Sequence, residues 1–199
     1  MRLPAEQRRS QLLEVAVELF AERGFHSTSM EDIADAAGIT KPVVYQHFPS
    51  KRALYRELVE DVDTQLTDRL LAATASAATG RERVQEGFAA YFRFVAAHRA
   101  AFRLLFGASV RNDPEFALVA EATIDRLADL IADLIEIAGP PEQRRTLAHA
   151  VVGMAEATSR RVANAEGEDD PERLARWLAE MAWFGLRGVR ADEPAVERT

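Results

Sequence analysis

Residues 29–51 predict two short helices joined at a glycine, which limits this part of the chain to a tight helical hairpin. The first helix has an apolar stripe at helical spacing, formed by Met30, Ile33, Ala34 and Ala37. Gly38 is expected to end that helix, because glycine adopts the left-handed backbone conformation that a sharp exit requires. The second helix is then expected to begin after Thr40, with Pro42 in its first turn, where a missing N–H costs little.

The start of the first helix carries two overlapping capping patterns. Thr28 stands three residues before Glu31, and this is the spacing of a capping box. Ser29 stands three residues before Asp32 and satisfies the same spacing. The sequence therefore predicts a capped helix start and leaves open which pair forms it.

The second helix of the pair has a face without an obvious partner inside the chain. At 100° per residue, Val44 and Phe48 share one face and are expected to point inward. The other faces carry Lys41, Pro42, Val43, Tyr45 and Gln46. Glutamine pairs with adenine, lysine reaches guanine or phosphate, and small apolar groups contact a thymine methyl. This favours a helix–turn–helix that enters a DNA major groove, while a plain helical hairpin with a solvated face remains the alternative.

Residues 10–58 resemble the DNA-binding domain of TetR-type bacterial repressors. The segments that carry the resemblance are Ser10-Gln-Leu-Leu-Glu-Val-Ala, Leu19-Phe20-Ala-Glu-Arg-Gly24-Phe25, Ile33-Ala34, Gly38-Ile39, Tyr45-Gln-His-Phe48 and Lys51-Arg-Ala-Leu54. The resemblance implies an all-helical homodimer that binds a palindromic double-stranded DNA operator. It also implies that transcription is blocked until a small molecule enters the C-terminal domain.

The resemblance assigns roles to individual residues of this segment. The positions implied to read bases are Lys41, Pro42, Val43 and Gln46. The positions implied to contact phosphates are Thr28, Ser29, Thr40, Tyr45, His47 and Lys51. Val43 offers contact without a hydrogen bond, so specificity is expected to depend on its neighbours.

The charge of the chain is acidic overall, with 25 Lys and Arg against 32 Asp and Glu, a net charge of −7. Residues 1–52 are balanced, because they hold seven basic and seven acidic side chains. Screening removes charge effects beyond about 8–10 Å at ordinary salt, so only the local field at the phosphates controls contact. Arg2, Arg8 and Arg9 suggest an N-terminal arm near DNA, or simply a solvated tail.

Composition excludes several classes of protein. The 199 residues are 48% hydrophobic, contain no cysteine, and show neither a signal peptide nor a membrane-spanning run, so a cytoplasmic bacterial protein without membrane contact is expected. The four histidines lack metal-ligand spacing, and no glycine-rich loop follows a strand. We therefore expect no enzymatic activity, metal or cofactor.

The remaining chain predicts only helices, so the fold class is all-α. We expect a helix–turn–helix domain over 1–56, a ligand-binding and dimerisation domain over 57–190, and a flexible tail over 191–199. Apolar residues at 54, 58, 62, 66 and 70 form a ladder along one helix that joins the two domains. Further helices are expected at 81–97, 100–106, 113–138, 142–165 and 170–188.

The last two helices are the expected dimer surface. The final helix is apolar around most of its circumference and so needs two partners, one in its own domain and one in a symmetry mate. The residues assigned to the interface are Val151, Ala155, Leu178, Trp183 and Leu186. The alternative is a central helix buried inside a monomer.

The middle of the chain is rich in aromatic residues and suggests an effector pocket. The candidate lining residues are Phe88, Tyr91, Phe92, Val95, Phe102, Phe106, Phe116, Ile124, Leu127 and Met154. The same spacing also suits an ordinary hydrophobic core. Residues 41–48 are similar to those of some actinobacterial regulators of lipid metabolism, which implies a hydrophobic or amphipathic effector such as a fatty acyl compound.

The sequence as a whole predicts a ligand-responsive repressor that a small molecule releases from DNA. The alternative is a helical scaffold that binds other proteins without specific DNA binding. That alternative leaves the outward position of Lys41, Pro42 and Gln46 unexplained.

Overall fold

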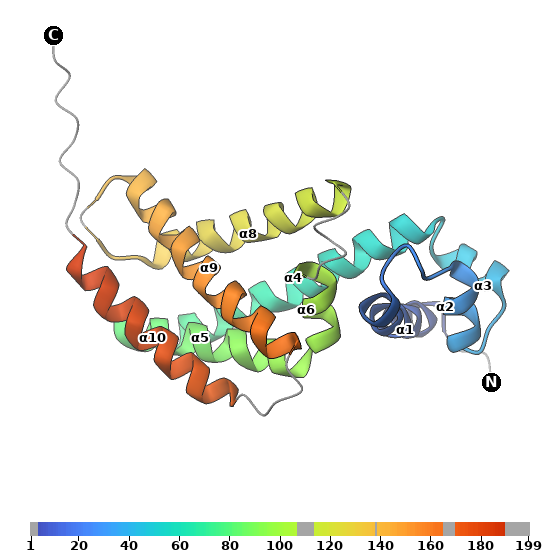
Figure 1. The fold of residues 1–199 in the computed structure, drawn as a ribbon, viewed down its shortest axis with the longest axis horizontal. Coiled ribbons are helices and arrows are strands. Elements are labelled where there is room, and N and C mark those ends of the chain that lie inside the picture. Colours follow the sequence, from blue (N-terminus) through green and yellow to red (C-terminus); the bar gives the residue numbers. More distant parts are fainter. Residues whose placement is uncertain (1–3, 107–113, 138, 165–169, 190–199) are drawn as a thin grey trace, which may run out of the picture. The chain divides into compact units, whose positions relative to one another are not determined.

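The computed structural model describes residues 4–106, 114–137, 139–164 and 170–189, and all regular elements in these ranges are helices (Figure 1). The predicted all-α fold class is confirmed. Several expectations lie outside the described residues, namely the arm residue Arg2, both end residues of the helix expected at 113–138, and the tail 191–199. No helix in the described part of the chain is both long enough and apolar enough to cross a bilayer.

The chain divides into two compact units. The first unit contains residues 1–65 and 98–117, and the second contains residues 66–97 and 118–199. Helix α4 (Lys51–Ala75) contributes residues to both. The predicted boundary after residue 56 therefore falls inside the first unit, because α6 (Arg99–Phe106) packs against α1 (Ala5–Arg23).

The first unit is built around α1, α2 (Met30–Ala36) and α3 (Lys41–His47), with the first part of α4 and α6. Its core contains the fully buried side chains of Leu12, Ile33, Val44, Phe48 and Leu54. A cluster of aromatic rings packs at the other end of the core, where Tyr55 contacts both Phe25 and Phe116. The phenol of Tyr55 donates a hydrogen bond of 2.9 Å to the carbonyl of Leu104, which ties α4 to α6.

Two glycines shape the turns of the first unit. Gly24 ends α1 with φ +82° and ψ 161°, a conformation that is open almost only to glycine. Gly38 follows α2 with φ +67°, in the left-handed region. The predicted turn between the two short helices is therefore confirmed.

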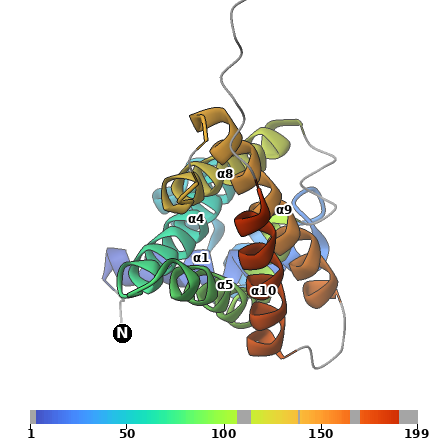
Figure 2. The ribbon, with the colours of Figure 1, turned by 90° about the vertical axis from the view of Figure 1, so that its left-hand side faces the viewer.

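The second unit consists of α5 (Gly80–Ala97), α8 (Pro114–Leu134) from residue 118 onward, α9 (Pro141–Asn164), α10 (Pro171–Gly188) and the end of α4. Helix α10 packs on α5 and α9, and α5 also contacts α9. Figures 1 and 2 show α9 passing between α8 and α10. Prolines begin three of these helices, as their fixed φ favours, and α8 ends at Leu134, four residues before the expected end.

The apolar ladder of α4 is buried along its whole length. Leu54, Leu58 and Val62 are buried in the first unit, and Leu66 and Leu70 are buried in the second. One helix therefore supplies core residues to both units, as the spacing of these residues predicts.

Candidate nucleic-acid interface and cavity

Helix α3 presents the face that its periodicity predicts. Val44 is 0% exposed and Phe48 1% exposed, so these side chains anchor the helix to the core. Lys41, Pro42 and Gln46 are exposed, as are Thr40 and Tyr45, while Val43 and His47 are half-buried. The four candidate base-reading residues therefore lie on one short helix with its polar tips accessible.

Arg9 of α1 holds the C-terminal end of α3. Its guanidinium donates a 2.9 Å hydrogen bond to the carbonyl of His47, forms an ion pair with Glu57, and lies 4.5 Å from the ring centre of Phe48. A cation at this end also suits the negative pole of the helix dipole. Arg9 is thus a positioning residue for α3 and not part of a loose N-terminal arm.

Ser29 caps α2. The Ser29 hydroxyl accepts from the Asp32 N–H at 3.1 Å, and the Asp32 carboxylate accepts from the Ser29 N–H at 2.7 Å, so the capping box is the Ser29–Asp32 pair. Hydrogen bonds from Ser29 are the main cause that lowers the pKa of Asp32. A phosphate at Ser29 would have to compete with this carboxylate.

Thr28 has a different role from the expected phosphate contact. Its side chain is 1% exposed, and its hydroxyl donates to the carbonyls of Gly24 at 2.9 Å and Leu19 at 3.3 Å. These carbonyls belong to the end of α1, where the helix leaves acceptors without partners. Contrary to the expectation, the Thr28 hydroxyl points inward and is engaged in hydrogen bonds within the first unit.

Lys51 is largely engaged within the first unit as well. Its ammonium donates to the carbonyls of Phe25 at 2.6 Å and Thr28 at 2.7 Å, and it lies 4.3 Å from the Phe25 ring centre. Burial lowers the pKa of Lys51, and the neighbouring Arg52 adds to this effect. The lysine therefore fixes the loop between α1 and α2 and still keeps a half-exposed side chain.

A shallow hollow of about 340 Å³ brings several of these groups together. It is lined by His26, Ser27, Thr28, Ser29, Met30, Lys41, Tyr45 and Lys51. Sequence reasoning missed His26 and Ser27, although both belong to the loop before the capping box. Lys41 pairs with Glu31 at 3.2 Å, but both side chains are exposed, and such a pair contributes only about 0–1 kcal/mol. Lys41 is therefore not held firmly by Glu31.

The second unit contains a partly open cavity of about 650 Å³, which is in the size range of small-molecule sites. Its wall is mainly apolar and includes Leu70, Val84, Phe88, Leu127, Leu130, Ile131, Leu134, Ile135, Val152 and Leu186. The polar groups on the wall are Thr74, Arg83, Tyr91, Glu136 and Arg187. Burial raises the pKa of Tyr91 far above its usual value, with a smaller opposing effect from Ser159, so the phenol stays neutral.

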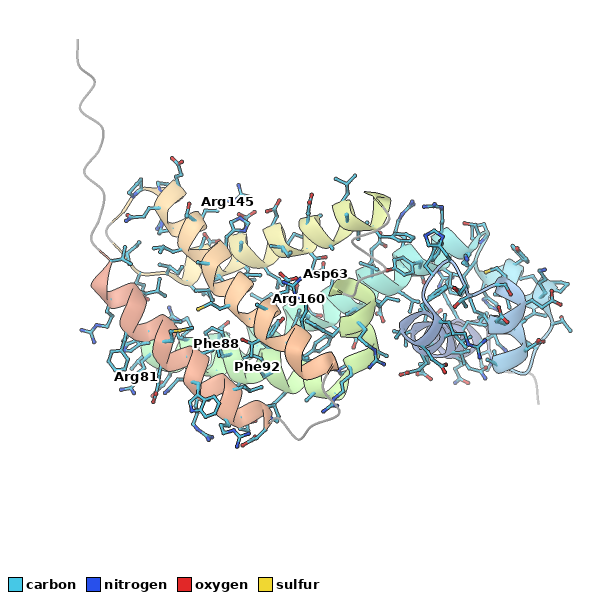
Figure 3. The ribbon with its side chains drawn as sticks, viewed as in Figure 1. Asp63, Arg81, Phe88, Phe92, Arg145 and Arg160 are labelled. Carbon is cyan, nitrogen blue, oxygen red and sulfur yellow. The ribbon has the colours of Figure 1, made fainter. Side chains whose placement is uncertain are left out.

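Only part of the expected pocket lies on this cavity. Phe88, Tyr91 and Leu127 line it, whereas Phe92 and Val95 are buried in the core. Figure 3 labels Phe88 and Phe92 on α5, where their rings stack at 6.4 Å. Ile124 and Met154 were also expected there, but they are half-buried and do not line the cavity. Phe102 and Phe116 belong to the first unit. The side chain of Phe106 lies outside the described residues.

The residues assigned to a dimer surface are turned into the second unit. Val151, Ala155, Trp183 and Leu186 line the cavity, and Leu178 is buried. This orientation is contrary to the outward one that the sequence analysis expects, because α10 packs on α5 and α9 with that face. The large apolar residues that α10 leaves exposed are Trp177 at 57%, Met181 at 54% and Phe184 at 64%.

An exposed, anchored second helix after a glycine turn defines a helix–turn–helix DNA-binding protein, and a separate helical unit holds an apolar cavity. Two known sequence families match the chain. The first, "Bacterial regulatory proteins, tetR family", matches residues 12–58. The second, "Tetracyclin repressor-like, C-terminal domain", matches residues 80–185.

Individual relatives agree with this assignment. The HTH-type transcriptional activator FasR of Mycolicibacterium smegmatis is 31% identical over 94% of this chain and 87% of its own. A TetR-like transcriptional regulator from Rhodococcus sp. RHA1 has a TM-score of 0.80 at 32% identity, covering 94% of this chain and 100% of its own. The fatty acid degradation regulator FadR from Bacillus halodurans has a TM-score of 0.76 at 16% identity over 92% and 96% of the two chains, which shows the fold alone.

This chain belongs to the TetR family of bacterial transcriptional regulators. It is a DNA-binding, ligand-responsive regulator, and its family is one of regulators and not of enzymes. The scaffold alternative is thereby set aside.

Proposed function

We propose that this protein is a homodimeric repressor that binds a near-palindromic operator and leaves it when a hydrophobic small molecule fills the cavity. Such a repressor acts in the bacterial cytoplasm, where the operator is. The observation that carries the proposal is the exposed side of α3, on which Lys41, Pro42 and Gln46 are accessible to solvent while Val44 and Phe48 anchor the opposite side. A glutamine on such a helix pairs with adenine in the major groove, and a lysine reaches guanine or phosphate.

Gel shifts with the DNA upstream of the protein's own gene test the reading helix. Gln46→Ala should reduce discrimination at one base pair per half-site by about 1–3 kcal/mol, because one bidentate contact is lost. Gln85→Ala, on α5 in the second unit, is the matched control and should leave discrimination unchanged. If Gln46→Ala binds matched and mismatched operators as the wild type does, α3 does not read bases through Gln46.

The proposed dimer surface consists of the exposed apolar residues of α10 and the exposed small residues of α9. Trp177, Met181 and Phe184 project from α10, and Ala150, Gly153 and Ala157 are exposed on α9. Beyond the adjacent residues and the local backbone of α9, no atom lies within 4 Å of the position that a Cβ would take at Gly153, so a partner side chain has room there. Large and small residues on adjacent helices suit an isologous twofold interface.

Sedimentation of charged variants tests this surface. Phe184→Glu should yield monomers and weaken operator binding, because a two-fold site needs both recognition helices at once. Leu118→Glu is the control, since Leu118 is 67% exposed but lies on α8. A Phe184→Glu protein that remains dimeric would move the interface elsewhere.

The cavity is the proposed effector site, and a fatty acyl compound is the first candidate because the wall is mainly apolar. Coupling is proposed to run through α4, since Leu70 and Thr74 line the cavity while Leu54 and Leu58 belong to the core of the first unit. A ligand that shifts this helix changes the placement of α3, and two such helices must lie about 34–36 Å apart to meet adjacent turns of one DNA face.

Mass spectrometry of small molecules that copurify with the protein identifies the candidate effector. Operator affinity is then measured with and without it, and effector affinity with and without operator. Linkage requires that the compound changes operator affinity by the same factor by which the operator changes the affinity for the compound. Operator affinity that does not change with any bound compound would refute the proposed release mechanism.

A further inference from the structure

Two arginines, Arg83 and Arg187, line one end of the cavity. Arg83 lies in the first turn of α5, and Arg187 lies in the last turn of α10. The indole of Trp183 connects these two turns, because a Cβ at Gly80 would lie 3.4 Å from its ring, and the Arg187 guanidinium lies 5.5 Å from its centre. Both cations are therefore at the same end, and the wall beyond them is mainly apolar.

The charge of this end is opposite to that of the protein. The wall carries two arginines and one carboxylate, Glu136, so its formal charge is positive, whereas the chain has a net charge of −7. Arg83 donates to Glu136 at 2.9 Å, with side-chain exposures of 26% and 74%. An ion pair with so exposed a carboxylate is weak, so an incoming anion can replace Glu136 on Arg83.

From these contacts we infer that the cavity accepts an amphipathic anion. Its apolar chain lies against the wall, and its carboxylate or phosphate head binds Arg83 and Arg187. Glu136 is the internal competitor that occupies Arg83 in the free protein. The inference rests on the proposed function, in which this cavity is the effector site, and it adds the head-group class that the site selects.

Calorimetric titration with three probes of equal chain length tests the head group. Dodecanoate should bind at least about tenfold more tightly than dodecanol, a difference of about 1.4 kcal/mol. Dodecyl phosphate, compared with dodecanoate, shows whether the site prefers a phosphate or a carboxylate head group. Tighter binding of either of these anions than of dodecanol supports the inference. Equal binding of acid, phosphate and alcohol would overturn it.

Charge variants locate the head group. Arg83→Gln and Arg187→Gln should each remove most of the preference for dodecanoate and leave dodecanol binding unchanged. Glu136→Gln should strengthen dodecanoate binding several-fold, because the competitor is gone. Arg81→Gln is the control, since Arg81 is exposed on α5 two residues away, is absent from the cavity wall, and removes the same charge (Figure 3).

Failure of this inference differs from failure of the proposed function. If dodecanol binds and releases the operator as well as dodecanoate does, the hydrophobic effector site stands and the anion site is refuted. If Arg81→Gln lowers dodecanoate affinity as much as Arg83→Gln does, the preference is one of net charge and the site is also refuted. If no probe binds and the operator is never released, the proposed effector site itself fails.

Discussion

The two glycines of the first unit give a prediction whose size follows from backbone geometry. Gly38 has φ +67°, and Gly24 has φ +82° with ψ 161°. At neither position does any atom beyond the adjacent residues of the chain lie within 4 Å of the place that a Cβ would take. Alanine at either site therefore meets no side-chain clash, and the whole effect is backbone strain.

The expected loss at Gly38 is modest. A left-handed conformation costs an L-residue about 1–2 kcal/mol. Alanine also lowers the entropy of the unfolded chain, which returns about 0.4–1 kcal/mol. Gly38→Ala should therefore lower the free energy of unfolding by roughly 1 kcal/mol, or Tm by about 2–4 °C. Gly24→Ala should cost more, because its region of the map is open almost only to glycine.

Thermal unfolding followed by circular dichroism measures the series. Gly38→Asn should recover part of the loss, because asparagine tolerates the left-handed region, while Gly24→Asn should not. Gly185→Ala is the control with the opposite sign, since Gly185 lies inside α10 with no atom within 4 Å and alanine favours a helix by about 0.5–1 kcal/mol. If Gly38→Ala raises Tm as Gly185→Ala does, the left-handed turn after α2 is refuted.

Three further predictions concern the contacts around α3 and the α1–α2 loop. Arg9→Met should lower operator affinity, and in urea titration it should lower the free energy of unfolding by about 1–2 kcal/mol, because a half-exposed charged hydrogen bond to His47 is lost. Unchanged operator affinity would contradict the positioning role of Arg9. Thr28→Val should cost about 1–3 kcal/mol in unfolding while leaving the salt dependence of operator binding unchanged, because its hydroxyl serves carbonyls and not DNA. The pKa of Asp32 is lowered in the folded state, so its contribution to stability is present above its ordinary pKa of 3.8 and is lost as pH falls through the folded value. The free energy of unfolding, measured as pH is lowered below 3.8, should therefore fall less in Asp32→Asn than in the wild type. An equal fall in both proteins would contradict this.

The inside and outside faces of α3 could be predicted because the helix is short and packs with one side only. Val44 and Phe48 are buried, and Gln46 is exposed, as a period of 3.6 residues requires. The inward roles of Thr28 and Lys51 could not be predicted in this way. They depend on which backbone carbonyls the α1–α2 loop leaves without partners, and spacing along the chain carries no information about that.

The cavity was harder to predict because aromatic content does not tell where space remains. Phe116 packs in the first unit and Phe92 fills the core of the second. The sequence features that do coincide with the cavity are glycines of α5 and isoleucines near the end of α8. Gly80 and Gly87 lie seven residues apart on α5 and let the side chains of Trp183 and Thr74 pack close to the helix. Ile131 and Ile135 lie four residues apart around the end of α8. These residues line the cavity.

The last helix shows the limit of periodicity most clearly. The sequence predicts a helix that is apolar around most of its circumference, but a pattern of spacing cannot say which side meets the chain itself. The face with Trp183 and Leu186 covers the cavity, and Trp177 and Phe184 are left outside. The arrangement is decided by the long-range packing of α10 on α5, which no local pattern encodes.

The proposed DNA surface and the proposed anion site are both local exceptions in an acidic chain of net charge −7, and salt should separate them. Operator binding releases counterions from several phosphates, so its affinity should fall steeply as salt rises. Arg83 is only 26% exposed beside an apolar wall, and partly buried charges are screened much less. Dodecanoate affinity should therefore change by a smaller factor than operator affinity over the same salt range. Equal salt dependence of the two would mean that the dodecanoate head stays in solvent and not on Arg83.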